Sequence, residues 1–372
     1  MTAPPPHADV VVVGAGLAGA SAALVLSRDR DVVLVEADRP GAGASGAAAG
    51  LVNPFMGRKA KRAWRADEAL DALGELVDEA GASALLHRVG VVRPAAAGQA
   101  EAFRERAAEH PDALEWLGGA AAAERFPHVA ASAGALLARR GGHVEVGALA
   151  AAFVQAAEGR GARHVRARLL GWDAAPGGAA GVTVHTDAGD VRAWHLVLCL
   201  GDGARHLPAL AALPLHRVKG QTVTLAAPPA LGPAHPAVAG RGYVVPGARS
   251  VVVGATFEHD FEHADPDPAL DAELRAQAAA LVPALGGATV LDRRAGVRLT
   301  VPAAVAPGRL PLAGPLGGGV WVLTGLGAKG LLTAPLLARR LPDALDGRVP
   351  LPPEVGVALA WRPGRTGRGG PS

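Results

Sequence analysis

The sequence predicts an α/β protein in which a parallel-sheet domain is interrupted by a second, β-rich domain. Three observations support this prediction. The chain opens with a strand, a glycine-rich turn, a helix and a second strand between Asp9 and Glu36. Further α/β blocks follow near His143 and after Arg309. Alternating strand patterns lie between these blocks, and such an interruption is typical of a domain inserted into an α/β domain.

The opening segment, DVVVVGAGLAGASAALVLSRDRDVVLVE, has the pattern of a dinucleotide-binding unit. Residues 9–13 and 32–35 are apolar runs typical of buried strands, and small or apolar residues at helical spacing lie between them. Gly14, Gly16 and Gly19 form G-x-G-x-x-G directly after the first strand. The first glycine allows the tight turn, the second admits a pyrophosphate, and the third lets the helix pack closely. The N-terminus of that helix favours the phosphates.

Glu36 ends the second strand of this unit. A carboxylate at that place accepts hydrogen bonds from the ribose hydroxyls of an adenosine and repels a 2′-phosphate. FAD or NAD is therefore expected rather than NADP. A glycine-rich turn without a ligand is the alternative, and the two strands and the acid argue against it.

A loop rich in glycine and alanine follows at residues 41–54. Its small residues favour a loop pressed against a flat ligand, and a purely structural turn is the alternative. Residues 66–80 then predict an amphipathic helix. Residues 85–137 mix short strand signals with helical stretches that bear Glu and Arg.

The second α/β block predicts a helix at 146–158 and strands at 165–170, 182–186 and 196–200. The last of these strands runs into Gly201-Asp202-Gly203. This second tight turn suits a phosphate or close helix packing, so Gly201 is a candidate cofactor residue.

Strands are expected at 221–225 and within 243–255, a helix at 269–285, a strand at 320–324 and a helix at 331–345. The domain prediction follows from these elements. Residues 1–84, 143–215 and 296–348 are assigned to the nucleotide-binding domain, residues 85–142 and 216–295 to the second domain, and residues 349–372 to a disordered tail.

Composition limits the function classes. Half of the residues are apolar, as in a globular protein, and the formal net charge of +3 is too small to indicate nucleic acid by itself. Cys199 is the single cysteine of the sequence, so no internal disulfide forms and a reducing compartment is expected. The N-terminal residues lack the pattern of a signal peptide, which predicts a cytoplasmic protein. The histidines show no metal-ligand spacing, and no metal is expected.

Many segments in order resemble the D-amino acid oxidase and glycine oxidase superfamily of FAD-dependent oxidoreductases. They are GAGLAG with Glu36, SGAAAGLVNP, LCLGDGA, VKGQ, GYVVPGARSVVVGAT, AGVR, and RLPLAG followed by VLTGLGAKGLLTAP. The ending VLTGLGAKGLLTAPLLA and a basic stretch are also similar to the oxidase domain of the bifunctional enzyme of tRNA 5-methylaminomethyl-2-thiouridine biosynthesis. The resemblance implies an FAD-binding Rossmann-like domain of the glutathione-reductase type, with an inserted α+β substrate domain built on an antiparallel sheet. No histidine lies in the GASGAAAG loop, so the FAD is expected to be non-covalent.

The resemblance also implies cofactor contacts, residue by residue. The pyrophosphate positions are Gly14, Ala15, Gly16 and Gly19, and the ribose positions are Glu36 and Ala37. The glycine- and alanine-rich loop adds phosphate contacts from Ala44 and Ser45 and backbone beside the isoalloxazine from Ala49, Gly50 and Leu51. The turn under the pyrimidine end of the flavin is formed by Gly327, Ala328, Lys329, Gly330 and Leu331.

The place of this turn near the flavin is also expected on physical grounds, apart from the resemblance. Reduced flavin carries negative charge near N1 and the C2 oxygen, and the N-terminus of the helix at 331–345 would stabilise that charge. Lys329 would add a full positive charge there. A solvent-facing lysine is the alternative reading.

Tyr243 and Arg298 resemble the catalytic-site residues of the superfamily. Tyr243 matches the active-site tyrosine, and Arg298 matches the arginine that binds the substrate carboxylate in a bidentate way. An ion pair is the alternative for Arg298, because the link to RLPLAG is long and Gly308 replaces an aspartate that the family has there. Arg293 and Arg294 are the other candidates for this role.

The resemblance predicts an FAD-dependent oxidase that acts on the C–N bond of an amino acid or N-substituted glycine. A hydride passes from the α-carbon to flavin N5, the imine is hydrolysed, and oxygen yields H2O2. One alternative is the same oxidation of carboxymethylaminomethyl-uridine in tRNA, which removes its carboxymethyl group. Another is a flavoprotein dehydrogenase or an electron-transfer subunit that does not use oxygen.

A basic stretch after Asn53-Pro54 bears on the choice between these substrates. It contains Arg58, Lys59, Lys61, Arg62 and Arg65. A solvated surface is the usual explanation of such a run, and steering of a small anion or binding of tRNA phosphates are the functional ones. Trp64 is the one aromatic residue within the stretch, so weak RNA binding and a small-molecule substrate are expected.

Overall fold

The computed structural model describes residues 7–174 and 181–359. The chain divides into two compact units. The first unit comprises residues 1–44, 150–218 and 297–372, and the second comprises residues 45–149 and 219–296. In this division residues 45–84 lie in the second unit, whereas the sequence assigns them to the nucleotide-binding domain.

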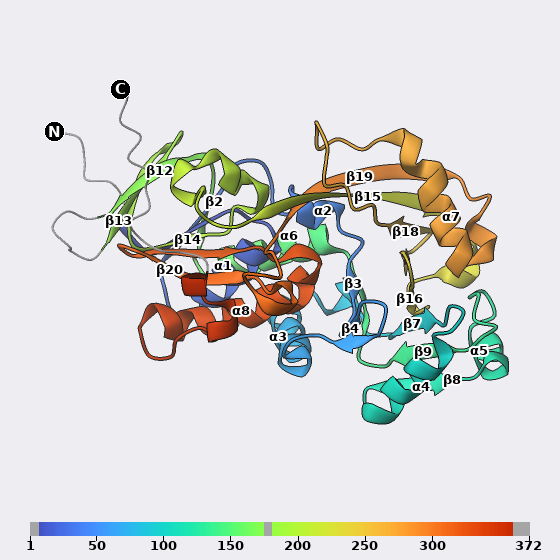
Figure 1. Ribbon diagram of the computed structural model, residues 1–372. Helices are drawn as coiled ribbons and strands as arrows, with labels where there is room; N and C mark the ends of the chain where they lie inside the picture. The colour runs from blue at the N-terminus through green and yellow to red at the C-terminus, as the bar shows by residue number, and fades with distance from the viewer. Residues whose placement is uncertain (1–6, 175–180, 360–372) are drawn as a thin grey trace, which may run out of the picture. The chain divides into compact units, whose positions relative to one another are not determined.

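The first unit is built on a twisted, mainly parallel sheet (Figure 1). Parallel pairing gives the order β11-β2-β1-β14, and β21 is also parallel to β14. The central strand β14 is long enough to pair with β1 along one side and with both β13 and β21 along the other. The strands are β1 (His7–Val13), β2 (Val32–Glu36), β11 (Arg163–Arg166), β12 (Leu169–Ala174), β13 (Val182–Thr186), β14 (Gly189–Leu198), β20 (Leu312–Gly317) and β21 (Val320–Thr324).

Two helices of the first unit pack against each other. These are α1 (Leu17–Leu26) and α8 (Gly330–Leu345). Every residue of α1 is buried. This explains why α1 consists of small and apolar residues on all sides instead of an amphipathic pattern. A third helix, α6 (Val146–Glu158), begins in the second unit and ends in the first.

The second unit has a sheet in the order β19-β15-β18-β17-β16-β7-β9-β8. Strand β16 pairs with β7 in parallel, and the pairs β15–β18, β18–β17, β17–β16, β7–β9 and β9–β8 are antiparallel, in line with the predicted α+β domain. The strands are β7 (Val91–Pro94), β8 (Leu114–Leu117), β9 (Ala135–Ala138), β15 (His216–Ala226), β16 (Ala237–Ala239), β17 (Tyr243–Pro246), β18 (Ser250–Gly254) and β19 (Val290–Thr300). Strand β15 begins in the first unit, and β19 ends in it.

Smaller elements complete the second unit. Strands β3 (Leu51–Val52), β10 (Gly142–Val144) and β6 (Leu86–His87) form a three-stranded sheet, and β4 (Phe55–Met56) pairs with β5 (Lys61–Arg62). The helices are α2 (Ala44–Ala47), which begins at the last residue of the first unit, α3 (Ala66–Glu79), α4 (Ala100–Glu109), α5 (Gly119–Arg125) and α7 (Asp271–Leu281).

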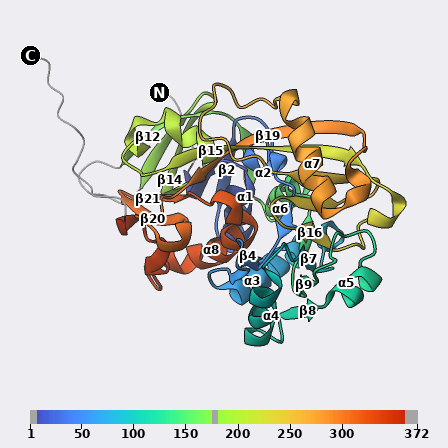
Figure 2. The same ribbon diagram turned by 45° about the vertical axis from the view of Figure 1, so that its right-hand side comes forward.

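Both faces of the large sheet in the second unit are covered by apolar packing. On one face, Leu274 and Leu281 of α7 join Val244 and Val253 in a buried cluster. A separate cluster contains Phe55 and Val245, and Tyr243 packs against it. Successive residues of β17 therefore alternate between the two clusters. Figure 2 shows α7 on its sheet, and α4 and α5 beside β8 and β9.

Three sequence expectations differ from the structure. The strand expected at 165–170 is two strands, β11 and β12, which pair with different neighbours. The helix expected at 269–285 is α7 flanked by short 3-10 segments that begin at Pro268 and Pro283, because proline cannot donate within a continuous helix. Part of the predicted tail is packed: Val355 and Val357 are buried, and Gly356 bridges to Ala313. Residues 360–372 lie outside the described residues.

A buried histidine makes the stability of the second unit depend on pH. His143 is 2% exposed, and its ring centroid lies 4.8 Å from that of His87. Burial, followed by the neighbouring His87, lowers the pKa of His143 from 6.5 to about 4. Between these two values the unfolded chain binds the proton and the folded chain does not. Stability is therefore complete above about pH 6.5 and falls as the pH drops toward about 4.

His143→Gln is expected to flatten the pH dependence of the unfolding temperature between about pH 6.5 and 4.5. The matched control is His259→Gln, which changes an exposed histidine of the same unit and should keep the wild-type slope. Thermal unfolding followed by circular dichroism at half-unit pH steps provides the measurement. Identical slopes for wild type and His143→Gln would contradict the prediction.

Candidate functional site

The glycine-rich turn of the first unit is shaped by close backbone approaches. Gly14 has a φ of +98°, and a Cβ placed on it would lie 2.4 Å from the carbonyl oxygen of Cys199. A Cβ on Gly19 would lie 1.7 Å from the carbonyl oxygen of Gly14. Both contacts are closer than real Cβ atoms make, so side chains are excluded at both positions. The turn expected from the sequence is present, with β14 and α1 packed directly against it.

The N-terminus of α1 suits an anion. Gly16 is its N-cap residue, no side chain caps it, and its first turn contains no acidic residue. Backbone N–H groups at such a helix end have no intrahelical acceptor. The donors, together with the helix dipole, fit the pyrophosphate of a dinucleotide.

Glu36 is fixed beside this turn by two backbone hydrogen bonds. Its Oε2 accepts from the N–H of Ala15 at 2.6 Å, and its Oε1 accepts from the N–H of Asp38 at 2.9 Å. The carboxylate at the end of β2 is therefore held against the glycine-rich turn, and Ala37 beside it is exposed. This placement is compatible with the ribose role that the sequence predicts for Glu36 and Ala37.

The second glycine-rich turn of the first unit precedes α8. Residues Gly327–Lys329 form a 3-10 segment, and no side chain caps the N-terminus of α8. The ammonium of Lys329 donates to the carbonyl oxygens of Gly308 and Arg309. Burial and the nearby Arg309 lower the pKa of Lys329. Lys329 is thus held by a neighbouring turn and is not a solvent-facing lysine.

Gly201 begins a 3-10 segment, Gly201–His206, after β14. Its φ is +52°, and a Cβ there would meet no atom within 4 Å. The following Asp202 binds Arg217 through two hydrogen bonds of 2.7 and 2.9 Å. The turn expected from the sequence is present and is positioned by this ion pair.

The glycine- and alanine-rich loop contains more regular structure than a loop, because α2 and β3 lie within it. The carbonyl oxygen of Ala47 accepts a hydrogen bond of 3.2 Å from the hydroxyl of Thr222. Gly50 has a φ of +82°, and a Cβ on it would lie 1.6 Å from the carbonyl oxygen of Val144. Glycine is therefore required here by the approach of β10, a cause that the sequence pattern does not reveal. Ser45 and Ala49 lie on either side of Ala47, and Leu51 pairs with His143.

Tyr243 begins β17 and lies across the neighbouring strand. It pairs with Gly254 of β18, and a Cβ on Gly254 would lie 2.7 Å from the Tyr243 hydroxyl. The ring occupies space that a side chain at 254 would fill. Tyr243 is half-buried, with its ring against the apolar cluster that contains Phe55.

Arg298 is the least exposed of the three arginine candidates in β19. It is half-buried between the buried residues Val297 and Leu299. Arg293 is exposed and bound to Asp271, with a shortest contact of 2.5 Å. Arg294 is exposed and bound to Asp292 at 3.0 Å. Arg298 belongs to the first unit and Tyr243 to the second.

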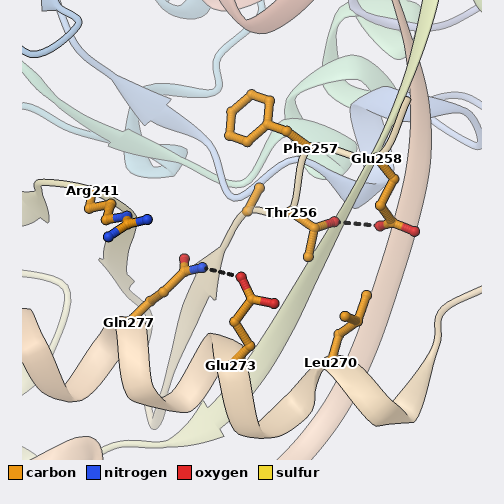
Figure 3. Close-up of a pocket in the computed structure, with 8 residues that line it drawn as sticks. Arg241, Thr256, Phe257, Glu258, Leu270, Glu273 and Gln277 are labelled. Atoms are coloured by element: carbon orange, nitrogen blue, oxygen red, sulfur yellow. Dashed lines mark hydrogen bonds between the residues drawn. The ribbon is translucent and has the colours of Figure 1, made fainter. Parts of the chain in front are cut away.

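The sequence did not single out a pocket of about 340 Å³ in the second unit (Figure 3). Its lining residues are Arg241, Ala255, Thr256, Phe257, Glu258, Leu270, Glu273 and Gln277. These residues are far apart along the chain and meet because α7 packs against β17 and β18. Arg241, which lies two positions before Tyr243, is the feature that could have signalled a site here.

Lys219 of the VKGQ segment is buried next to this pocket. Its side chain is 4% exposed, and its ammonium lies 3.3 Å from Glu258. The Thr256 hydroxyl donates to Glu258 at 2.5 Å and accepts from the N–H of Gln221 at 2.8 Å. This network fixes the segment that follows β18.

The basic stretch forms the β4–β5 hairpin and the residues that follow it. Arg62 pairs with Asp67, and Arg65 lies 3.2 Å from Glu68. Arg58, Lys59 and Lys61 are exposed and make no ion pair with another described residue. Among the described residues, Arg62 and Arg65 are thus neutralised by carboxylates, whereas the other three basic residues of the stretch are not.

Metal-binding clusters and membrane-spanning helices are both absent from the part of the chain that the structure describes. No group of three or more His, Cys, Asp or Glu side chains among them is arranged to hold a metal ion. None of their helices is long and apolar enough to cross a membrane.

Comparisons with known proteins agree with this geometry. Residues 9–344 match the model of the FAD dependent oxidoreductase family DAO. The chain is 34% identical over 361 residues to the tRNA 5-methylaminomethyl-2-thiouridine biosynthesis bifunctional protein MnmC of Maricaulis maris, covering 96% of this chain and 55% of that protein. It is 29% identical over 375 residues to the glycine oxidase of Pseudomonas aeruginosa, covering 95% and 99% of the two chains.

The chain spans between 55% and 60% of the length of three such bifunctional relatives. Among solved structures, the glycine oxidase of Geobacillus kaustophilus superposes with a TM-score of 0.79 at 24% identity, covering 92% of this chain and 96% of that one. This likeness confirms the predicted fold. With the family model matched over residues 9–344, the chain belongs to the DAO family of FAD-dependent oxidoreductases.

Proposed function

We propose that this enzyme oxidises the C–N bond of an amino acid or an N-substituted glycine. The observation that carries the proposal is the state of the arginines in β19. Arg293 and Arg294 are exposed and bound to carboxylates, whereas Arg298 is half-buried between apolar residues. A guanidinium at such a position suits a bidentate carboxylate.

The first unit fits FAD through the two helix ends described above. Gly14, Ala15, Gly16 and Gly19 would hold the pyrophosphate, and Glu36 with Ala37 would hold the ribose. Gly327, Ala328, Lys329, Gly330 and Leu331 would lie at the pyrimidine end of the flavin, with Gly201 as a further contact. Ala44, Ser45, Ala49, Gly50 and Leu51 would contribute from the glycine- and alanine-rich loop.

FAD, when bound, supplies the hydride acceptor and is reoxidised by oxygen. The protein's own residues orient the substrate. Arg298 binds the carboxylate and Tyr243 adds a hydrogen bond, so the α-carbon is held in one position. A neutral amine needs no strong base from the protein, because its own lone pair assists the departure of the hydride.

The cofactor state gives the first test. We expect the purified protein to be yellow and to release FAD on heat or acid denaturation, since no attachment histidine lies in the loop and Glu36 opposes a 2′-phosphate. Absorbance and chromatography of the supernatant provide the measurement. Flavin that stays with the precipitated chain would contradict non-covalent binding, and bound NADP would contradict the role of Glu36.

The substrate class is tested by anaerobic reduction of the bound flavin. Glycine, sarcosine, D-alanine, D-proline and modified tRNA are each added, and loss of the visible absorbance of the oxidised flavin is followed. Bleaching by the N-substituted glycine would support the proposal, and bleaching by none of the amines would refute it. Air is then admitted, and peroxide formation separates an oxidase from a dehydrogenase that passes electrons to a partner.

Oxidation of a modified uridine in tRNA is the second candidate function. The observation that favours it is the identity of 34% to the bifunctional protein of Maricaulis maris over 96% of this chain. The exposed cations of the β4–β5 hairpin, Arg58, Lys59 and Lys61, offer contacts for phosphates.

We expect the hairpin to bind RNA weakly, because Arg62 and Arg65 are already paired with carboxylates. The test is a tRNA gel shift at increasing salt with the variant Arg58→Gln, Lys59→Gln, Lys61→Gln. The control is Arg104→Gln, Arg106→Gln, Arg125→Gln, which removes the same charge elsewhere in the second unit. A shift that survives moderate salt and is lost in the first variant alone would favour the tRNA reading, since phosphate contacts give a steep salt dependence.

A further inference from the structure

The pocket of about 340 Å³ in the second unit has two charged residues of opposite sign that face it unpaired (Figure 3). Arg241 is exposed in the loop between β16 and β17, and Glu273 is exposed on α7. Among residues 7–174 and 181–359, neither side chain makes an ion pair. The two charges therefore remain available to a ligand.

A neighbouring side chain holds Glu273 in place without neutralising it. Gln277 lies one helical turn after Glu273, and its Nε2 donates to Glu273 Oε1 at 3.0 Å. The other acid of the pocket, Glu258, is already bound to Lys219 and Thr256. Glu273 is thus the carboxylate of this pocket that lacks a cation.

Gln277 adds a second feature of a binding position. Its Oε1 is buried and receives no hydrogen bond within the described part of the chain. A Cβ on Gly242 would lie 2.8 Å from this oxygen, so the amide packs against the segment that joins Arg241 to Tyr243. A buried acceptor without a donor is rare and requires an explanation, and ligand binding next to it is one.

We propose that this pocket binds an amino-acid zwitterion, with the carboxylate at Arg241 and the ammonium at Glu273. An anion alone would leave Glu273 repelling it, and a cation alone would be repelled by Arg241. A molecule that carries both charges on one carbon satisfies both groups. Phe257, which is 64% exposed, and Leu270 provide apolar surface for the carbon skeleton.

The zwitterion can come from two sources. One is a free amino acid. The other is the amino-acid end of a longer amine substrate, because Ala255 of the pocket directly follows Gly254, on which the Tyr243 hydroxyl lies. The second source rests on the proposed function, and the first does not.

Binding is tested on the FAD-loaded protein by calorimetry with cycloleucine, 1-aminocyclopentane-1-carboxylate. This zwitterion has no α-hydrogen and cannot be oxidised by loss of a hydride. Cyclopentanecarboxylate and cyclopentylamine, which each carry one of the charges, should bind at least about tenfold more weakly, the range of a lost charge-assisted contact. Arg241→Gln and Glu273→Gln should each weaken cycloleucine binding at least about fivefold.

Matched controls are Arg249→Gln and Glu262→Gln, which neutralise exposed residues of the same unit outside the pocket and should bind as wild type. Wild-type affinity in both Arg241→Gln and Glu273→Gln would overturn the proposal. Cycloleucine binding that is lost in Arg298→Ala but kept in the two pocket variants would also overturn it, because the ligand then occupies the oxidising site.

Steady-state kinetics with two substrates identify the source of the zwitterion. Nδ-carboxymethyl-ornithine carries the glycine unit on a secondary amine and an amino-acid group at its far end, whereas N-carboxymethyl-butylamine lacks that group. If the pocket holds the far end of a substrate, Arg241→Gln and Glu273→Gln raise KM for the first compound at least about fivefold and leave the second unchanged. If the pocket holds a separate amino acid, the two pocket variants keep the wild-type KM for both compounds and still bind cycloleucine more weakly than wild type. Failure of both compounds to reduce the flavin refutes the proposed function and leaves the binding result to decide the pocket.

Discussion

Gly19→Ala is expected to remove FAD from the purified protein and to destabilise its first unit. The added methyl would lie 1.7 Å from the carbonyl oxygen of Gly14, a backbone atom that cannot rotate away. Overpacking of a rigid site typically costs about 1–3 kcal/mol, and a backbone obstacle places this substitution at the upper end of that range or beyond. The FAD-to-protein ratio from absorbance and the unfolding temperature provide the measurement.

Gly171→Ala is the matched control for this substitution. It adds the same methyl in the first unit, in β12, and that methyl would meet no atom within 4 Å. The control should keep its FAD and its unfolding temperature. A fully loaded, wild-type-like Gly19→Ala protein would show that the turn is not built as described.

Arg298→Ala is expected to abolish turnover of carboxylate-bearing substrates while FAD remains bound. Truncating one partner of a buried, hydrogen-bonded charge pair typically costs about 2–5 kcal/mol, so kcat/KM should fall by tens to thousands of fold. Tyr243→Phe removes one hydrogen bond and should have a milder effect, about 0.5–1.5 kcal/mol. Steady-state kinetics of the loaded enzyme provide the comparison.

Arg293→Ala is the control for the loss of an arginine from β19. Arg293 is exposed and bound to Asp271 of α7, so its removal should leave the kinetics unchanged. Wild-type kinetics in Arg298→Ala would show that the carboxylate anchor lies elsewhere.

The local pattern of the first unit was predictable because it rests on short-range signals. Strand periodicity and the glycine spacing located β1, α1 and β2 within a few residues, since each signal lies inside the element that it predicts. The glycines at 14 and 19 have the predicted close approaches. The predicted contacts of these residues with FAD remain predictions.

Other features depend on contacts that a linear pattern does not contain. The resemblance places Gly50 beside the flavin, which stays a prediction, and the structure adds the carbonyl of Val144 as a reason for glycine at this position. Val355 and Val357 lie in a stretch whose composition indicated disorder, but they are buried against the sheet of the first unit. The pocket at Arg241 was missed because its walls come from separate segments that only the packing of α7 brings together.

The arrangement of β14 has a consequence for synthesis on the ribosome. Leu196, Val197 and Leu198 pair with β1 on one side and with Val320, Trp321 and Val322 on the other. The nascent chain thus carries an unpaired, apolar strand edge while residues 219–296 of the second unit are being made. Such an edge is a site of aggregation, and sheets closed by distant segments form slowly. Slower translation between codons 200 and 320 would prolong this exposure and increase the dependence of yield on chaperones.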